Sequence, residues 1–301
     1  MSAELAGRCV VLTGASSGIG LETAKGLALR GADLILVCRS AERGAAAVAE
    51  IQQAAPGHGS ITLRLGDLAE QADVRRVAQE ILAHVPAVHV LINNVGAVYT
   101  ECALTTDGVE RQHATNCVNP FLLTRLLLPA LQRGSAAGEP SRVVCVCSLA
   151  HRRSRWLPGM LRGEGRYVSL LTYRHSKLCQ ALIAVELARR LSPQRVTVNS
   201  LCPGYVATEI GAKHARGLAR GVWRFASRFF QSPSEGSRTP VFLAASPEVR
   251  GVTGQFFEKC RQTTYAPAAQ SRESACELWN LCSELCGLDA TLSPVELGEV
   301  R

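Results

Sequence analysis

The stretch CVVLTGASSGIGLETAKGLALRGADLILVC, residues 9–38, decides the fold. It begins with an apolar, β-rich run at 9–13, turns through glycines, continues as a helical pattern through Arg30, and ends in a second apolar run at 33–38. Apolar runs without alternation are typical of strands that are buried on both faces. The stretch therefore predicts a strand–helix–strand unit of a parallel sheet.

The same alternation continues along the chain. We expect further strands at 61–65, 88–93, 142–147 and 195–201. We expect helices at 41–55, at 72–85, around 106–133, and over the segment that contains Tyr173. Helices between parallel strands cover both faces of the sheet. The prediction is an α/β fold with a doubly wound parallel sheet of the Rossmann type, in a single domain over residues 5–288. Residues 205–232 are expected to form a helical substrate lid, and 289–301 a flexible tail.

Composition and charge narrow the function classes. With 301 residues, 47% of them hydrophobic, the chain can bury a sizeable core. The net charge of +8 is compatible with nucleic acid, an anionic membrane surface, a phosphorylated cofactor or simply a solvated basic surface. The total charge by itself favours the solvated surface. A cofactor and a lid account for the arginines better than nucleic acid does, so no nucleic-acid partner is predicted.

Twelve cysteines are spread along the chain without a CxxC pair or a regular spacing. The first residues lack the apolar core of a signal peptide, and no apolar run is long enough to span a membrane. We therefore expect reduced thiols that pack as small apolar groups, no metal site, and no transmembrane helix. The expected location is the cytoplasm or the surface of an intracellular membrane.

The turn after the first strand carries Gly14, Gly18 and Gly20 in the spacing G-x3-G-x-G. Glycines allow a tight turn and a close backbone approach. The following helix, expected to begin near Ile19, presents free N–H groups and a partial positive charge to a pyrophosphate. Because the turn lies between a strand and a helix, it predicts a dinucleotide site.

The end of the second strand indicates which dinucleotide binds. The sequence there is VCRSAER, with Arg39 and no acidic residue before Glu42. A carboxylate would bind the ribose 2′-hydroxyl of NAD, whereas a guanidinium suits a 2′-phosphate. NADP(H) is therefore favoured over NAD(H). The alternative is that Arg39 is only a surface charge.

Tyr173 and Lys177 lie one helical turn apart, and Ser148 follows a strand. By itself the pair is no more than an exposed i,i+4 contact. With Ser148 and the glycine turn, it predicts carbonyl chemistry: Ser148 orients the substrate oxygen, Tyr173 exchanges a proton with it, and the Lys177 ammonium favours the phenolate. His175 points to another helix face and suits solvent or packing. Whether His151 lines the pocket stays open.

Further motifs occur in a fixed order: TGASSGIG (13–20), NNVG (93–96), Asn116, Ser148, YRHSK (173–177) and PGYVATE (203–209). With them the chain resembles the short-chain dehydrogenase/reductase family over nearly its whole length, and within it the retinol dehydrogenase group most. The resemblance implies that Asp67 binds adenine, that Asn93 holds the fourth strand against the cofactor, and that Asn116 fixes a water behind Lys177. It also assigns cofactor contacts to Ser16, Ser17, Ile19, Leu68, Pro203, Gly204 and Thr208.

Three places depart from the family pattern. Val95 stands in a tight place where the smaller alanine is usual, and Cys147 stands where serine is common. CVNP at 117–120 replaces a more usual polar-glycine sequence after Asn116. None of these changes removes a catalytic group.

Substrate specificity is expected to come from 151–169 and 205–232. Within the second segment, 213–230 reads as a basic amphipathic helix with apolar and arginine faces. It covers an apolar pocket, docks on an anionic membrane, or does both. The alternative is a core-packed helix with solvated arginines.

The predicted function is hydride transfer between NADP(H) and the carbonyl or alcohol of an apolar substrate, such as retinal or another lipophilic aldehyde or ketone. The alternative is a cofactor-binding scaffold or sensor with little turnover. Members of the family that the chain resembles often form dimers, but no residue of this sequence indicates one. Whether the chain forms a homodimer therefore stays open.

Overall fold

Eight strands of the chain form one sheet in the order β3-β2-β1-β4-β5-β6-β7-β8. The computed structural model describes residues 4–136, 138–204 and 231–299. The strands are β1 Cys9–Thr13, β2 Asp33–Cys38, β3 Ile61–Leu65, β4 Val90–Asn93, β5 Ser141–Val146, β6 Val196–Cys202, β7 Phe256–Glu258 and β8 Arg261–Thr263. Neighbours pair in parallel except β7 and β8. The expected doubly wound parallel sheet is therefore confirmed.

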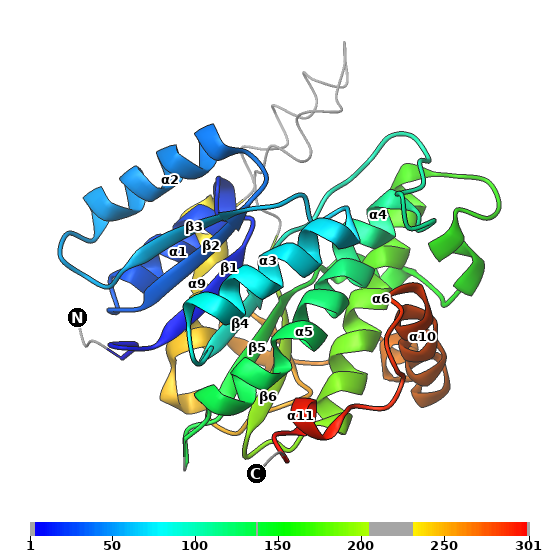
Figure 1. Cartoon of the computed structure of the whole chain (residues 1–301). Coiled ribbons are helices and arrows are strands. Elements are labelled where there is room, and N and C mark those ends of the chain that lie inside the picture. The colour runs from blue at the N-terminus through cyan, green and yellow to red at the C-terminus, as the bar shows by residue number, and fades with distance from the viewer. Residues whose placement is uncertain (1–3, 137, 205–230, 300–301) are drawn as a thin grey trace.

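Helices cover both faces of this sheet (Figure 1). The longer ones are α1 Gly18–Ala28, α2 Ala41–Ala54, α3 Gln71–His84, α5 Asn119–Gly134, α6 Ser169–Arg190, α9 Pro233–Ala245 and α10 Arg272–Leu285. The short ones are α4 Arg111–His113, the π-helix η1 Ala114–Val118, α11 Pro294–Leu297, and the 3-10 turns η2 Leu149–Arg153, η3 Pro158–Arg162, η5 Pro247–Val249 and η6 Pro267–Gln270. Helices α1 and α9 contribute to one core layer, and α3, α5 and α6 to the other.

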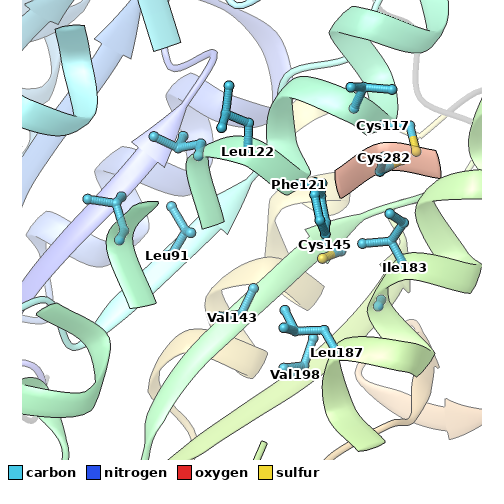
Figure 2. Packing of buried hydrophobic residues seen from close by; sticks show 14 of the residues in the cluster. Leu91, Cys117, Phe121, Leu122, Val143, Cys145, Ile183, Leu187, Val198 and Cys282 are labelled. Atoms are coloured by element: carbon cyan, nitrogen blue, oxygen red, sulfur yellow. The ribbon is translucent and has the colours of Figure 1, made fainter. Parts of the chain in front are cut away.

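The two core layers explain why the strands are apolar throughout. In β1, Val10 belongs to the layer under α1 and α9, whereas its neighbour Val11 belongs to the layer under α3, α5 and α6. Figure 2 shows the second layer, where Leu91 of β4, Val143 of β5 and Ile183 of α6 lie in the same cluster. Successive side chains of a strand point to opposite faces, so a sheet covered twice needs apolar residues at every position.

The strand predictions hold closely at the start of the chain. The first three strands have the expected bounds, and the next three differ by one or two residues. The strands β7 and β8 were not expected. Each has only three residues, which is too short for a recognisable periodicity. The lid expected at 205–232 lies outside the described residues between 205 and 230, so it stays a prediction.

The helix α10 lies against α6 at the edge of the molecule (Figure 1). Its Trp279 is fully buried and meets Phe121 of α5 edge-on, with ring centroids 4.9 Å apart. The Trp279 indole N–H donates to the carbonyl of Ala290. The segment after α10 is therefore tied to the same cluster.

The last described residues fold back onto α5, which differs from the flexible tail expected for 289–301. A capping box between Ser293 and Glu296 begins α11. The Glu296 carboxylate forms an ion pair with Arg125, whose surface is only 3% exposed. A nearly buried guanidinium on α5 requires a counter-charge. No local sequence pattern reveals this long-range pairing.

All twelve cysteines are free thiols, and most are buried in the two core layers. Their burial agrees with the expectation that they pack as small apolar groups, and the reduced state stays a prediction.

Neutralising Glu296 tests the tail contact. Burial would raise the pKa of Glu296, but hydrogen bonds from Arg125 and Ser293 outweigh it, so the pKa lies below its usual value. We expect Glu296→Gln to lower the free energy of unfolding by about 1–3 kcal/mol at neutral pH. A lowered carboxyl pKa gives stability that is present above the unfolded pKa of about 4.3 and is lost as pH falls through the folded pKa. The difference between variant and parent should therefore shrink in acid.

Urea unfolding at a series of pH values measures this difference. The exposed Glu299 lies in the same segment, and Glu299→Gln is the matched control with the same change of charge. Equal stabilities of the two variants would contradict the proposed role of the Arg125–Glu296 pair.

Candidate active site

Four of the expected site segments meet at the carboxyl ends of the parallel strands. The glycine turn follows β1, NNVG begins at the end of β4, Ser148 follows β5, and Pro203 and Gly204 follow β6. Ligands of open α/β sheets bind at this edge. The paired strands β1, β4, β5 and β6 bring together residues that are far apart in the sequence.

The glycine turn is built so that side chains would not fit. Gly14 has φ +72, a left-handed conformation that favours glycine. A Cβ placed on Gly20 would lie 2.1 Å from the Gly14 carbonyl oxygen. The helix α1 begins at Gly18, and the hydroxyl of its N-cap residue Ser17 forms no capping hydrogen bond. The turn therefore leaves the N-terminus of α1 available to an anionic group.

A residue that the sequence analysis did not single out, Asn94, joins this turn to β4. Its side-chain nitrogen donates to the carbonyls of Thr13 and Gly14, and its backbone N–H donates to the Thr13 hydroxyl. Asn93, to which the resemblance gave the structural role, instead donates to the Thr124 hydroxyl on α5. The adjacent asparagines point to opposite sides of β4, and the motif by itself does not distinguish their tasks.

The Ser148 side chain lies beside the phenol of Tyr173. Burial raises the pKa of Tyr173 to about 12, while the Ser148 side chain acts in the opposite direction. The Ser148 oxygen also accepts from the Ala150 N–H and so begins the turn η2. The serine is thus fixed beside the phenol.

Lys177 lies one turn further along α6 and is buried. Its ammonium group lies 6.0 Å from the centre of the Tyr173 ring. It donates to the Val146 carbonyl at 3.0 Å and to Gln180 Oε1 at 2.9 Å. Burial lowers the pKa of Lys177. Gln180 was not identified from the sequence, although it follows Lys177 on the same helix.

Asn116 lies in the π-helix η1, just before α5. Its amide forms two hydrogen bonds with the backbone of Ala97, and its nitrogen also donates to the Ser176 hydroxyl. The side chain thereby ties the loop after β4 to α6. The π-helix was not expected, but Pro120 was a signal for it. Proline has no N–H to donate to the Asn116 carbonyl, so a regular α-turn would leave that oxygen unpaired.

The residues expected to bind the adenosine end lie after β2 and β3. Arg39 is 69% exposed, and its guanidinium is 3.8 Å from the Asp67 carboxylate. Asp67 also accepts a hydrogen bond from the Ala69 N–H. The side chain of Leu68 is buried in the core, and its carbonyl accepts from Asn119. Arg39 and Asp67 are therefore the accessible side chains here.

The remaining expected cofactor contacts lie after β6. Gly204 has φ +91, and a Cβ there would meet the Gln231 side chain. Thr208 and the segment 213–230 lie outside the described residues, so their expected roles stay predictions.

Two histidines form a buried chain beside α6. His113 Nε2, His175 Nδ1 and Cys179 Sγ lie within 4.8 Å of one another, a grouping that could hold a metal ion. However, the Leu157 N–H donates to His175 Nε2, which places the proton of a neutral imidazole on Nδ1. This proton points at His113 Nε2, at 2.8 Å, and the Glu110 carboxylate binds His113 Nδ1. Both ring nitrogens of each histidine therefore have a hydrogen-bond partner, and His175 packs inside the protein.

His151 is also buried rather than open to a pocket. Its Nδ1 binds the Ser148 carbonyl, and its Nε2 accepts from the Ala266 N–H. It braces the turn after Ser148 against η6.

The fold and this set of residues define an oxidoreductase of the Rossmann type. A protein-family model described as short chain dehydrogenase matches residues 8–218, more than half of the chain. The chain therefore belongs to the short-chain dehydrogenase family.

Curated relatives narrow the similarity within that family. The chain is 36% identical to retinol dehydrogenase 12 of Mus musculus over 285 residues, which covers 95% of this chain and 88% of the relative. It is 38% identical to retinol dehydrogenase 11 of Homo sapiens over 285 residues, covering 95% and 87%. The expected resemblance to the retinol dehydrogenase group is thereby confirmed.

Solved structures are similar as well. A crystal structure of a protein from Mycobacterium paratuberculosis has a TM-score of 0.76 and 30% identity, and covers 97% of this chain and 99% of that chain. Pseudomonas aeruginosa RhlG, solved as an active-site complex with NADP, has a TM-score of 0.69 and 25% identity, covering 85% and 95%. Among the described residues, no helix is both long and apolar enough to cross a membrane.

A substitution in the glycine turn tests the dinucleotide site. We expect Gly20→Ala to weaken binding of NADPH at least about tenfold, because the added carbon overlaps the Gly14 carbonyl and forces the turn open. Fluorescence titration with NADPH measures the affinity. The control is Gly57→Ala, which strains the backbone at φ +73 but adds a carbon that meets nothing within 4 Å. Unchanged affinity in Gly20→Ala would show that the pyrophosphate does not bind at this turn.

Proposed function

We propose that the chain transfers a hydride between NADP(H) and the carbonyl or alcohol of an apolar substrate, with Tyr173 as general acid and base. The observation that carries the proposal is the placement of the Tyr173 phenol beside Ser148, with the Lys177 ammonium 6.0 Å from the centre of the Tyr173 ring. Membership of the short-chain dehydrogenase family supports the same reading. The nicotinamide cofactor supplies the hydride chemistry when it is bound.

In the direction of reduction, the protonated phenol of Tyr173 is the acid. Its raised pKa keeps the proton on the oxygen at neutral pH until a developing alkoxide accepts it. Ser148 holds the substrate oxygen within reach of the phenol and donates a hydrogen bond to it. In the direction of oxidation the phenolate is needed, and the Lys177 ammonium stabilises that charge.

Arg39 supports NADP(H) as the cofactor. Its guanidinium is exposed at the end of β2, where it can form charge-assisted hydrogen bonds with a 2′-phosphate. The Asp67 carboxylate lies 3.8 Å from the Arg39 guanidinium. It follows β3, however, and does not occupy the position after β2 at which a carboxylate would favour NAD(H). The NADP complex of the similar RhlG structure agrees with this choice.

Apolar side chains at the start of α6 support a lipophilic substrate. Leu170 is 55% exposed and Leu171 50% exposed, less than one turn before Tyr173. Leu157 and Val168 in the preceding segment are also exposed. Relatives named retinol dehydrogenases favour retinal or a similar aldehyde. The homodimer and the membrane contact of 213–230 stay predictions.

Replacing Tyr173 by phenylalanine tests the chemistry. We expect Tyr173→Phe to lower the turnover of all-trans-retinal and of a panel of apolar aldehydes and ketones by about 10²–10⁴-fold, because it removes the proton donor. NADPH binding should be retained. Oxidation of NADPH, followed by its absorbance, measures the turnover.

The control is Tyr265→Phe, which removes a buried hydroxyl that binds the Gln255 carbonyl. Cofactor binding without any Tyr173-dependent turnover across the panel would favour the scaffold or sensor reading over the enzyme.

Reversing the charge at Arg39 tests the cofactor. We expect Arg39→Asp to lower the ratio of kcat/KM for NADPH to that for NADH by about 10–100-fold, the value of one or two charge-assisted hydrogen bonds. The control Arg272→Asp changes an exposed arginine at the start of α10 and should leave the ratio unaltered. A preference of the parent protein for NADH would refute the role given to Arg39.

A further inference from the structure

A small cavity lies in the core between β4, β5, α5 and α6, next to the residue that contacts Lys177. Its volume is about 20 Å³, and its walls include Asn93, Cys145, Gln180 and Ile183. Figure 2 shows Cys145 and Ile183 close together there, with Phe121 beside them. A space of this size admits one water molecule and nothing larger.

Both amides in the walls have a fixed orientation. An ammonium group only donates, so the atom of Gln180 that receives Lys177 Nζ is Oε1, and Nε2 faces away from the lysine. The Thr124 hydroxyl donates to the Pro120 carbonyl and therefore accepts from Asn93 Nδ2. Asn93 Oδ1 consequently faces away from Thr124.

The two outward atoms are complementary. Gln180 Nε2 is a donor and Asn93 Oδ1 is an acceptor, and among the described residues neither has a hydrogen-bond partner. Each residue is only 3% exposed. An unpaired polar group at such burial destabilises the folded state. Both residues line the same cavity.

We propose that this cavity binds one ordered water, which accepts a hydrogen bond from Gln180 Nε2 and donates one to Asn93 Oδ1, and that Gln180 held in this way positions the Lys177 ammonium. The Cys145 sulfur in the cavity wall is a weak acceptor for the second proton of the water. The role of Lys177 in this inference rests on the proposed function; the water site does not. Gln180 is a positioning residue, because it acts through Lys177.

The surroundings of Lys177 explain why a single amide matters. The titratable groups near it are Tyr173, whose ring centre is 6.0 Å away, and the thiols of Cys117, Cys145, Cys147 and Cys202. Burial holds the pKa of Cys145 at about 12 and that of Cys147 at about 11, so neither thiol carries a charge at neutral pH. The hydrogen bonds that the Lys177 ammonium donates go to the carbonyl oxygens of Val146 and of the Gln180 side chain.

A crystal structure of the parent protein and of Gln180→Met tests the water site without any activity. We expect a density peak within about 2.7–3.2 Å of both Gln180 Nε2 and Asn93 Oδ1 in the parent, and none in the variant. Methionine has nearly the shape of glutamine but neither its donor nor its acceptor. An empty cavity in the parent, or a direct bond between the two amides, would overturn the water site.

The pH dependence of alcohol oxidation tests the positioning role. Removing an acceptor lowers the Lys177 pKa further and weakens the stabilisation of the phenolate, so the Tyr173 pKa rises. In Gln180→Met, we expect the pH at which the oxidation rate is half-maximal to rise by about one unit. Gln180→Glu keeps an oxygen toward Lys177 and should give no upward shift.

The matched control is Ile183→Val, which alters the cavity wall without touching a polar group. Its profile should coincide with that of the parent. The positioning role of Gln180 would be overturned if the pH profile of alcohol oxidation did not shift in Gln180→Met. An equal shift of that profile in Ile183→Val would overturn it too. Full turnover in Tyr173→Phe would instead refute the proposed function and leave the crystallographic result standing.

Discussion

The buried ammonium group of Lys177 is the constraint on which the site depends. A cation inside an apolar core loses several kcal/mol of hydration unless oxygen atoms surround it. Here the oxygens come from the last residue of β5, Val146, and from Gln180 on α6. The strand and the helix must therefore keep one relative position. Any sliding of α6 would leave the charge without acceptors.

Several contacts hold α6 in that position. The Cys147 thiol donates to the carbonyl of Lys177, and Ser176 binds Asn116 in the π-helix. On its outer side α6 is covered by α10, whose Trp279 reaches the cluster below. The Arg125–Glu296 pair then closes the C-terminal segment over α5. Helix α10 and the C-terminal segment, which lie outside the candidate site, thus help to fix the position of the Lys177 ammonium.

The sequence predicted those features of the fold and the site that depend on residues close together in the chain. Uninterrupted apolar runs predicted six strands because burial on both faces requires them, and ordered motifs predicted Ser148, Tyr173 and Lys177 as neighbours at the sheet edge. The helix containing Tyr173 was expected, but the burial of so much of its surface was not, because α10 covers it.

What the sequence did not predict depends on contacts between distant residues. His113 and His175, or Arg125 and Glu296, have no pattern that links them. The different partners of Asn93 and Asn94 depend on how β4 and the residue after it are placed against β1 and α5, which the motif does not reveal.

Val95 shows why roles assigned position by position are incomplete. The resemblance marked this residue as larger than usual for a tight place. A Cβ on Gly14 would lie 2.9 Å from the Val95 side chain, and Gly14 has none. The glycine therefore serves two purposes: it adopts φ +72, and it leaves room for the branched side chain opposite. The backbone N–H of Val95 still donates to the Thr13 hydroxyl, so the larger side chain leaves the link between β1 and β4 intact. The departure at 95 is accommodated because it faces a residue without a side chain, and a substitution at either position has to be judged together with the other.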